Sequence, residues 1–260
     1  SPYVGAPFEK CIINPASTGI HNDATADITV DGISIKNNFY RQKYSVSNEE
    51  IKMAAVNRVG FDVIEQKEKA RAKTWQLGIQ NVLFNGLKDG QTFGLLNQPG
   101  VTINTSLFPV APQEMTVAQI KAFAGSAIST YFNTTNGTYM PNRWLMPTES
   151  YMALGVPYGD TFGMPTLLDV FTNAFKAAGA PADFKIVHSL YNNEAGNGGH
   201  GRHVFYNDDV DNLVMYVPKA YTPHPLYAQG ALDMVSDAEG QFTGVQLKKT
   251  KTMLYADEQA

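Results

Sequence analysis

The stretch DVIEQKEKARAKTWQLGIQNVLFNGLKDGQTFGLLNQPGV, residues 62–101, carries the strongest structural signal in the chain. Apolar side chains at Trp75, Ile79 and Val82 follow a helical spacing, which predicts one continuous helix over 62–85. At about 1.5 Å per residue this helix is roughly 36 Å long. Such a length is unusual in a compact domain and indicates a structural spine.

The middle of this helix, EQKEKARAK at residues 65–73, is rich in charge and is expected to be solvated. Glu65 and Lys69 stand at the i,i+4 spacing with the acid first, the order that stabilises a helix. Residues 86–100 are then rich in glycine, but they lack the Gly-x-x-x-x-Gly-Lys pattern of a phosphate loop and follow a helix rather than a strand. The sequence therefore does not favour a nucleotide site here.

Upstream, residues 1–27 are interrupted by proline and glycine and predict an irregular arm. Residues 28–46 contain an Asp-Gly pair between alternating apolar runs, a strong hairpin signal, and are expected to form an extended β-hairpin. Because little apolar sequence is available to cover this hairpin, its deletion is expected to leave the remaining chain folded. Ser47 and Glu50 match a capping box and predict the start of a helix.

Downstream, further helices are predicted to begin at Thr116 and Thr166, each a candidate N-cap. Trp144–Pro147 predicts a buried strand. Further strands are predicted at Phe184–Leu190, His203–Tyr206, Leu213–Val217 and Phe242–Tyr255. This order of elements predicts an α+β fold.

The composition limits the classes of function. Of the 260 residues only 17% are charged, against roughly 25% in an ordinary globular chain. Such a surface suits burial against neighbouring subunits, although a polar, uncharged monomer surface is an equal alternative. The net charge of -4 gives no overall attraction to nucleic acid. Cys11 is the single cysteine, so no intrachain disulfide is possible, and we find no signal peptide and no apolar run long enough to cross a membrane.

One cluster contains possible metal ligands: His188, Glu194, His200 and His203 lie in or beside the glycine-rich loop 193–202. Their spacing matches no zinc signature, and a glycine-rich loop holds ligand geometry poorly. The sequence therefore favours a flexible loop that packs against copies of itself, and it indicates no metal site, no catalytic residue and no cofactor. Alanine at both His200 and His203 is accordingly expected to leave stability nearly unchanged.

Two other polar segments have ordinary structural explanations. Residues 208–211, DDVD, lack the glycine and the final glutamate of a calcium-binding loop, so we expect a solvated turn. Residues 221–227, YTPHPLY, have prolines on both sides of a histidine and predict an extended segment. An aromatic contact strip and ordinary core packing are equally good interpretations of that segment.

The segments NVLFNG (81–86) and FGLLNQPGV (93–101), which follow a long charged helix, resemble the major capsid proteins of tailed bacteriophages with the Hong Kong 97-like fold. The strand at 143–147 and the segment at 211–218 are similar to that family as well. The resemblance covers nearly the whole chain in order, and its most specific part is the Gly-Leu-Leu-Asn-x-Pro-Gly run. No lysine or asparagine here matches the crosslinking motif of some family members.

The resemblance implies a wedge-shaped subunit in which the glycine loop 193–202 lies near a five- or six-fold axis. Its implied parts are an N-terminal arm (1–27), an extended loop (28–46), a peripheral domain with the spine helix (47–114), an axial domain (115–235), and C-terminal strands that return to the peripheral domain (236–260).

The resemblance also implies a structural, non-enzymatic protein that assembles with itself, as hexamers and pentamers, into the icosahedral head shell around double-stranded DNA. Implied partners are portal, scaffold and decoration proteins, with packaged DNA contacted non-specifically and no membrane. The implied location is the virion, after assembly in the host cytoplasm. Two alternatives stay open: an encapsulin-type compartment shell and, less favoured, a metal-dependent enzyme using His188, His200 and His203.

Overall fold

The protein is described by a computed structural model that covers residues 3–5, 26–28, 35–56, 62–157, 165–230 and 232–258. The chain divides into two compact units, residues 1–35 and 36–260. In the first unit β1 (Tyr3–Gly5) pairs antiparallel with β2 (Ala26–Ile28). The prediction that residues 1–27 are irregular is therefore wrong for these two short strands.

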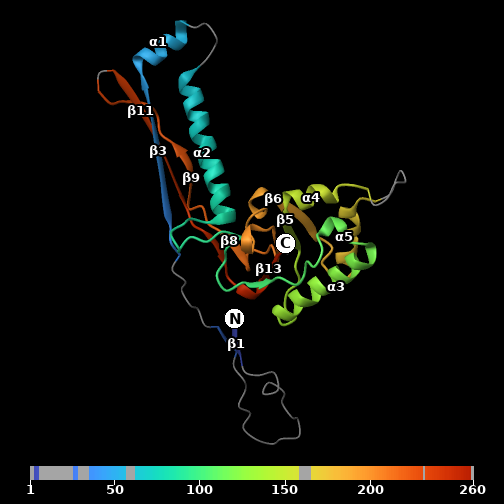
Figure 1. Ribbon diagram of the computed structural model, residues 1–260. Helices are drawn as coiled ribbons and strands as arrows, with labels where there is room; N and C mark the ends of the chain where they lie inside the picture. Colours follow the sequence, from blue (N-terminus) through green and yellow to red (C-terminus); the bar gives the residue numbers. More distant parts are fainter. Residues whose placement is uncertain are drawn as a thin grey trace, which may run out of the picture. The chain divides into compact units, whose positions relative to one another are not determined.

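The second unit mixes helices and sheets, as predicted (Figure 1). Its helices are α1 (Asn48–Val56), α2 (Val63–Asn85), α3 (Val117–Thr134), α4 (Thr148–Leu154) and α5 (Leu167–Ala177), with 3-10 turns η2 (Pro112–Glu114), η3 (Leu190–Asn192), η4 (Asn197–Gly199) and η5 (Thr250–Thr252). Its strands are β3 (Asn38–Ser47), β4 (Thr102–Asn104), β5 (Arg143–Pro147), β6 (Lys185–Ser189), β7 (Arg202–Tyr206), β8 (Leu213–Met215), β9 (Lys219–Pro223), β10 (Tyr227–Ala228), β11 (Asp233–Phe242), β12 (Val245–Leu247) and β13 (Met253–Asp257).

The observed helix starts agree well with those predicted from the sequence, because an N-cap depends only on residues close together in the chain. The side chain of Asp62 accepts the backbone N–H groups of the first turn of α2. Reciprocal capping boxes open α3 at Thr116 and α5 at Thr166, as predicted. At α1 the amide of Glu50 donates to Ser47 Oγ at 3.1 Å, and the amide of Ser47 donates back to the Glu50 carboxylate.

The end of α2 is joined to the glycine-rich stretch by direct backbone packing. Gly86 has φ +70° and ends the helix, and a Cβ at this position would lie 2.3 Å from the Thr92 carbonyl oxygen. A Cβ on Gly94 would lie 2.4 Å from the carbonyl oxygen of Phe84. Only glycine allows two backbones to approach this closely, so these positions explain the glycines in the motif.

Amide side chains complete this junction. Asn97 accepts the N–H of Gly94 at 2.6 Å and donates to the carbonyl of Asn85 at 2.8 Å, so one side chain links the helix end to the loop. Gln98 donates to the carbonyls of Gly94 and Val245, at 2.7 and 3.0 Å, and so ties the loop to β12. We call residues 84–98 the glycine junction.

The strands β3, β9, β10 and β11 form one sheet that runs beside α2 (Figure 1). The central strand is β11; β3 pairs with it antiparallel over its full length, from Asp233–Ser47 to Phe242–Asn38, and β9 and β10 pair with its other edge. The prediction of a self-contained hairpin over 28–46 is thus wrong for its second half. Its partner lies almost 200 positions later by residue number, beyond the range of a local turn signal, and the Asp-Gly pair itself lies outside the described residues.

This pairing also overturns the expected result of deleting residues 28–46. The deletion would remove β3, including the fully buried Val46, and would expose an edge of β11. We therefore expect the shortened chain to lose this sheet rather than remain folded.

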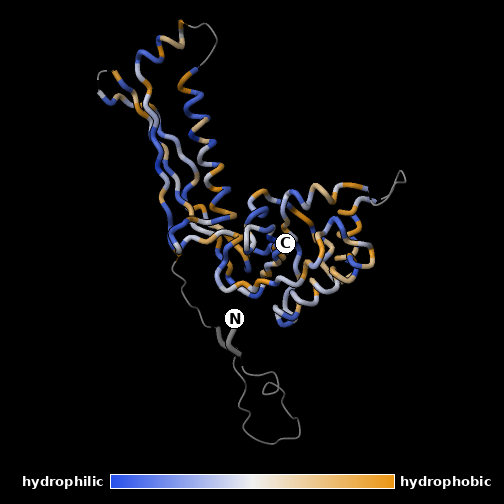
Figure 2. Tube along the Cα trace, viewed as in Figure 1, coloured by the Kyte–Doolittle hydropathy of each residue, from blue (hydrophilic) through white to orange (hydrophobic). Residues whose placement is uncertain are grey.

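The second sheet has the order β4-β13-β7-β5-β6 and contains both parallel and antiparallel pairs. On one face this sheet packs against α3 and α5 around the fully buried Trp144. The centroid of the Trp144 ring lies 5.2–5.6 Å from the ring centroids of Phe123, Phe175 and Phe205. The other face packs against the glycine junction through Leu95, Leu96 and neighbouring side chains. Figure 2 shows many apolar residues around this sheet, whereas polar and apolar residues mix along α2.

The C-terminal part differs from its prediction. Phe242–Tyr255 is not one strand: it contains the end of β11, then β12, which pairs with β8, and the start of β13. The predicted unit 236–260 is divided as well, because β11 joins the sheet beside α2 while β13 lies inside the five-stranded sheet. Helix α4 was not predicted.

Candidate functional site

His188 and His203, which the sequence presents as possible metal ligands without favouring a metal site, have separate structural partners. His188 bonds to the hydroxyl of Thr148 at 3.2 Å and stacks on Tyr151, with ring centroids 4.4 Å apart. His203, in contrast, is fully buried beneath the loop. Within the described part of the chain, no group of three or more His, Cys, Asp or Glu side chains is placed to hold a metal ion.

His203 belongs to a buried hydrogen-bond network. The indole N–H of Trp144 donates to Nδ1 at 3.2 Å, which leaves the proton on Nε2, 2.9 Å from the Glu258 carboxylate. Burial lowers the pKa of His203, with Glu258 opposing the shift, so the ring is neutral at pH 7. The expectation that alanine is tolerated at this position is therefore contradicted for His203.

A hydroxyl also reaches this network, since Ser150 Oγ donates to the same Glu258 oxygen at 2.9 Å. The carboxylate stands between the serine and the histidine, and both bond to it rather than to each other. A nucleophile and its base must be hydrogen-bonded directly, so this is not a nucleophilic triad. The arrangement instead ties the end of β13 to α4, β5 and β7.

The glycine-rich loop 193–202 is pinned at its flanks, contrary to the expectation that it is simply flexible. Arg202 and Asp257 form a buried two-point ion pair, at 2.7 and 2.9 Å, and the amide of Asn197 donates to Asp257 at 3.0 Å. Burial would raise the pKa of Asp257, but the bonds from Arg202 and Asn197 outweigh it and hold the pKa below its usual value. Within the loop, Glu194 and the tip at 197–199 are exposed.

The acidic segment 208–211 forms a turn, as predicted: the amides of Asn212 and Leu213 both donate to the carbonyl of Asp209 at 2.8 Å. The segment 221–227 contributes to β9 and β10 at the edge of the sheet beside α2. Tyr221 faces α2, so it packs inside the molecule rather than forming an external aromatic strip.

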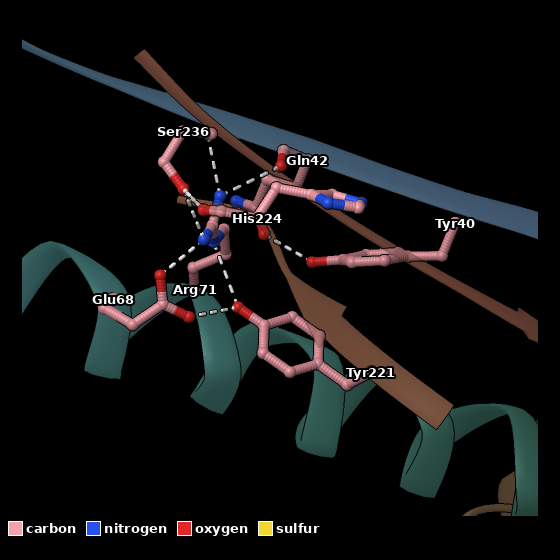
Figure 3. A network of polar contacts seen from close by, with 7 residues as sticks. All are labelled: Tyr40, Gln42, Glu68, Arg71, Tyr221, His224 and Ser236. Carbon is pink, nitrogen blue, oxygen red and sulfur yellow. Dashed lines mark hydrogen bonds and ion pairs between the residues drawn. The ribbon is translucent and has the colours of Figure 1, made fainter. Parts of the chain in front are cut away.

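The most concentrated polar site joins α2 to this sheet (Figure 3). Arg71 is 2% exposed, although it lies in the segment 65–73 that was predicted to be solvated. Its guanidinium donates to the hydroxyl of Tyr221, to the backbone and side chain of Ser236, and to the Glu68 carboxylate. The prediction that this segment is solvated is wrong for Arg71, because the number of charged residues along a sequence does not show which face of the helix packs against another element.

One helical turn further along α2, Trp75 makes the apolar counterpart of this contact. A Cβ on Gly240 of β11 would lie 2.5 Å from the Trp75 ring, so the indole lies directly on the strand. The rings of Tyr40, Phe242 and Tyr221 surround it with centroid distances of 4.9, 6.0 and 6.1 Å. We call Arg71 and Trp75 with these partners the sheet contact of α2.

Two surface features are left largely uncovered by the described residues. Large apolar side chains are exposed where α1 and the start of β11 meet, at the same end of the sheet in Figure 1. They are Met53, Val56, Tyr227, Leu232 and Met234, which are 36–76% exposed. In addition, no described strand pairs with the outer edge of β3, which carries the exposed Arg41 and Lys43. Exposed apolar groups and open strand edges are typical of surfaces that bind other chains.

Comparison with known families identifies the class of protein that the fold and surfaces define. The family model for the major capsid protein matches residues 18–258. The chain therefore belongs to the major capsid protein family, and its role is a structural one in a viral head shell. No helix among the described residues is long and apolar enough to cross a membrane. Comparison with curated protein sequences gives no match.

Solved structures of low sequence identity share the fold. The capsid of the myovirus phage XM1 matches with a TM-score of 0.75 at 14% identity, over 99% of this chain and 83% of that one. Gordonia phage Cozz matches with a TM-score of 0.55 at 10% identity, over 99% and 80% of the two chains. An encapsulin complex from Synechococcus elongatus matches with a TM-score of 0.51 at 9% identity, over 91% and 76%. The predicted Hong Kong 97-like capsid fold is confirmed.

Proposed function

We propose that the chain is the subunit of an icosahedral tailed-phage head, arranged as hexamers and pentamers around double-stranded DNA. The observation that carries the proposal is the match of the major capsid protein model to nearly the whole chain, together with the fold shared with the phage XM1 capsid. Assembly takes place in the host cytoplasm. Portal, scaffold and decoration proteins are its further partners, and it contacts packaged DNA non-specifically.

The physical support for self-assembly is surface that a single copy leaves uncovered. Apolar side chains at the α1 end of the sheet and the open edge of β3 both gain from burial against another copy. Only 17% of the residues are charged, which lowers the cost of removing the remaining surface from water. Many such weak contacts add in a closed shell, because each copy makes all of them at once.

We further propose that the protein performs no catalysis, with no catalytic residue and no cofactor. The polar networks support this, since Ser150, His203 and Glu258 are engaged with one another as buried structural groups. The division into peripheral and axial domains remains a proposal, in which the sheet beside α2 belongs to the first and the five-stranded sheet to the second. The location of loop 193–202 at a symmetry axis is likewise a proposal.

An encapsulin-type compartment is the second candidate, favoured by the match to the Synechococcus encapsulin complex. Its TM-score of 0.51 is well below the 0.75 found for the phage XM1 capsid. The two candidates differ in cargo: a phage head encloses DNA, whereas an encapsulin encloses protein. Nucleic-acid content of particles made in the presence of the other phage components separates them.

The direct test is electron microscopy and sedimentation of the purified full chain. We expect closed particles of uniform diameter, and Val56→Asp, which places a charge among the exposed apolar residues of α1, should reduce their yield strongly. Val56→Ala is the matched control, because it shortens the side chain without adding charge. A wild-type chain that remains monomeric at all concentrations, with and without scaffold protein, would contradict the proposal.

A further inference from the structure

We infer that Arg71 is the positioning residue that fixes the direction of α2 on the sheet of β3, β9 and β11, and that it holds β9 in that sheet. The inference deepens the proposed function, because the uniform shape of a shell subunit depends on how these elements lie together. The attachment of β9 can be measured by amide exchange on the full chain, whether or not that chain forms a shell.

The first argument is that the Arg71 guanidinium contacts several elements at once (Figure 3). Nε donates to the hydroxyl of Tyr221 on β9 at 3.0 Å. Nη1 and Nη2 donate to the carbonyl and hydroxyl oxygens of Ser236 on β11, at 2.8 and 3.0 Å. Nη1 also reaches the carbonyl of Gln42 on β3 at 3.4 Å. A planar fork with fixed donor directions sets an orientation, which a flexible ammonium group cannot do.

The second argument concerns charge. Arg71 is almost completely buried, and its cation is balanced by Glu68 one turn earlier and by the ring of Tyr44, whose centroid lies 4.6 Å from the guanidinium carbon. The Tyr221 hydroxyl donates to Glu68 at 2.6 Å and accepts from Arg71, so it links both members of the ion pair to β9. Burial raises the pKa of Tyr221 to about 12, which keeps this donor protonated. Removing the cation leaves these partners without their common donor.

The third argument is that the hydrogen-bond ladder between β9 and β11 is interrupted beside Tyr221, while Lys219 and His224 bond to Glu239 near the two ends of β9. Ala220 and Tyr221 together stand opposite Gly240 alone, so β9 carries a bulge where its hydrogen-bond ladder to β11 is interrupted. Pro223, at the end of the strand, has no N–H to donate. Tyr221 sits in this bulge, and its side chain supplies through Glu68 and Arg71 the attachment that the ladder lacks there.

The fourth argument is that the other contacts of α2 with the sheet fix its direction less firmly than Arg71 does. Lys67 donates to a carbonyl of β3 at 2.8 Å, but through a flexible ammonium group on a side chain that is 32% exposed, and the glycine junction holds only the C-terminal end of the helix. Arg71 and Val82 are its only fully buried residues among those described. Trp75 lies on Gly240 through ring contacts, which allow rotation about that point because they have no hydrogen-bond geometry. Arg71 is one turn away from this pivot, so its bonds are placed to prevent the rotation.

The test is hydrogen exchange measured by mass spectrometry on the full chain in one assembly state. Arg71→Met should raise amide exchange in 219–223 by at least about tenfold, because the hydrogen bonds of a charged donor are lost. Arg71→Lys keeps the charge without the fork and should give an intermediate increase. Lys73→Met removes an exposed charge from the same helix and should change nothing. Exchange in β7 should stay constant in all variants.

A second readout separates positioning from general stability. In variants matched for folded fraction, Arg71→Met should broaden the distribution of particle diameters, and Arg71→Lys should partly restore it. Should Arg71→Met fail to fold, Tyr221→Phe removes only the bridging hydroxyl and should accelerate exchange in 219–223 by about threefold or more. Exchange in 219–223 within about twofold of wild type in both Arg71→Met and Tyr221→Phe would overturn the inference. If the wild-type chain forms no particles, that result would count against the proposed function. The exchange measurement would still test the role of Arg71.

Discussion

Helix α2 is held at two places by different physical means. At its C-terminal end, the glycine junction packs backbone on backbone, with Gly86 and Gly94 too close to their neighbours for any side chain. In its middle, the helix contributes only side chains to the sheet contact, chiefly Arg71 and Trp75. The first attachment depends on close packing of backbone atoms, and the second depends on a few side-chain hydrogen bonds and ring contacts.

The difference indicates which attachment a single side chain can release. Backbone atoms at the glycine junction have no rotamers, so any change there displaces the chain itself. The sheet contact depends on the hydrogen bonds of one arginine and the ring contacts of one tryptophan, so replacing a side chain removes it without a backbone clash. A substitution at Arg71 therefore tests the direction of α2, whereas a substitution at the glycine junction tests whether the chain folds.

The largest expected effect comes from Gly94→Ala. The new Cβ would lie 2.4 Å from the carbonyl oxygen of Phe84 and 2.5 Å from the amide nitrogen of Gly86, and both are backbone atoms that cannot rotate away. We expect loss of folded, soluble protein, measured by circular dichroism and by yield after expression.

The matched control is Gly78→Ala within α2, where no atom lies within 4 Å of the added Cβ. Alanine is the better helix former, so this variant should gain about 0.5–1 kcal/mol of stability. The same substitution should thus have opposite effects at the two sites. A Gly94→Ala protein with wild-type melting temperature would show that the glycine junction is less rigid than its contacts indicate.

A smaller effect, on the five-stranded sheet that the glycine junction packs against, is expected on acidification. Burial lowers the pKa of His203 in the folded chain, so below about pH 6.5 the unfolded chain binds a proton that the folded chain does not. Stability should therefore fall as pH drops through this range, by up to about 1.4 kcal/mol per pH unit for the one group. The pKa values of Asp257 and Glu258 also lie below normal, so their contribution is lost at still lower pH.

The measurement is the melting temperature of wild type and His203→Gln between pH 7.5 and pH 5. His203→Gln should be less stable at pH 7.5, because two buried hydrogen bonds are altered, but its stability should fall less steeply with acid. His200→Gln, which changes a histidine that is not buried, should keep the wild-type slope. Equal slopes in wild type and His203→Gln would exclude His203 as the source of acid sensitivity.

The sequence predicted what depends on near neighbours. The length of α2 follows from its apolar spacing, and the starts of α1, α3 and α5 follow from their caps, which involve residues three positions apart. The Gly-Leu-Leu-Asn-x-Pro-Gly run indicated the family correctly. Here local propensity and the final structure agree, as they must in a sequence that folds reliably.

What depends on distant partners was not predictable. The partner of β3 is a strand almost 200 positions away, so the sequence places residues 39–46 with the local hairpin signal of 28–46. Arg71 sits within a charged segment, and only the three-dimensional position of Ser236 and Tyr221 shows that it is buried. The expected tolerance of alanine at His203 is at odds with the structure for the same reason: the partners of His203 are Trp144 and Glu258, neither of which belongs to the loop.

The smallest expected effect separates two ion pairs on the same helix. Glu65 and Lys69 bond at 2.6 Å, but their side chains are 57% and 63% exposed, whereas Arg71 in its pair with Glu68 is 2% exposed. Lys69→Ala should therefore cost no more than about 0.2–0.5 kcal/mol, and this cost should vanish in about 1 M salt, where screening removes most of the attraction. Thermal melting at low and high salt measures both points. A loss for Lys69→Ala comparable to that for Arg71→Met would mean that charge along α2, rather than contact with the sheet, holds the helix, and the contrast between the two attachments would then fail.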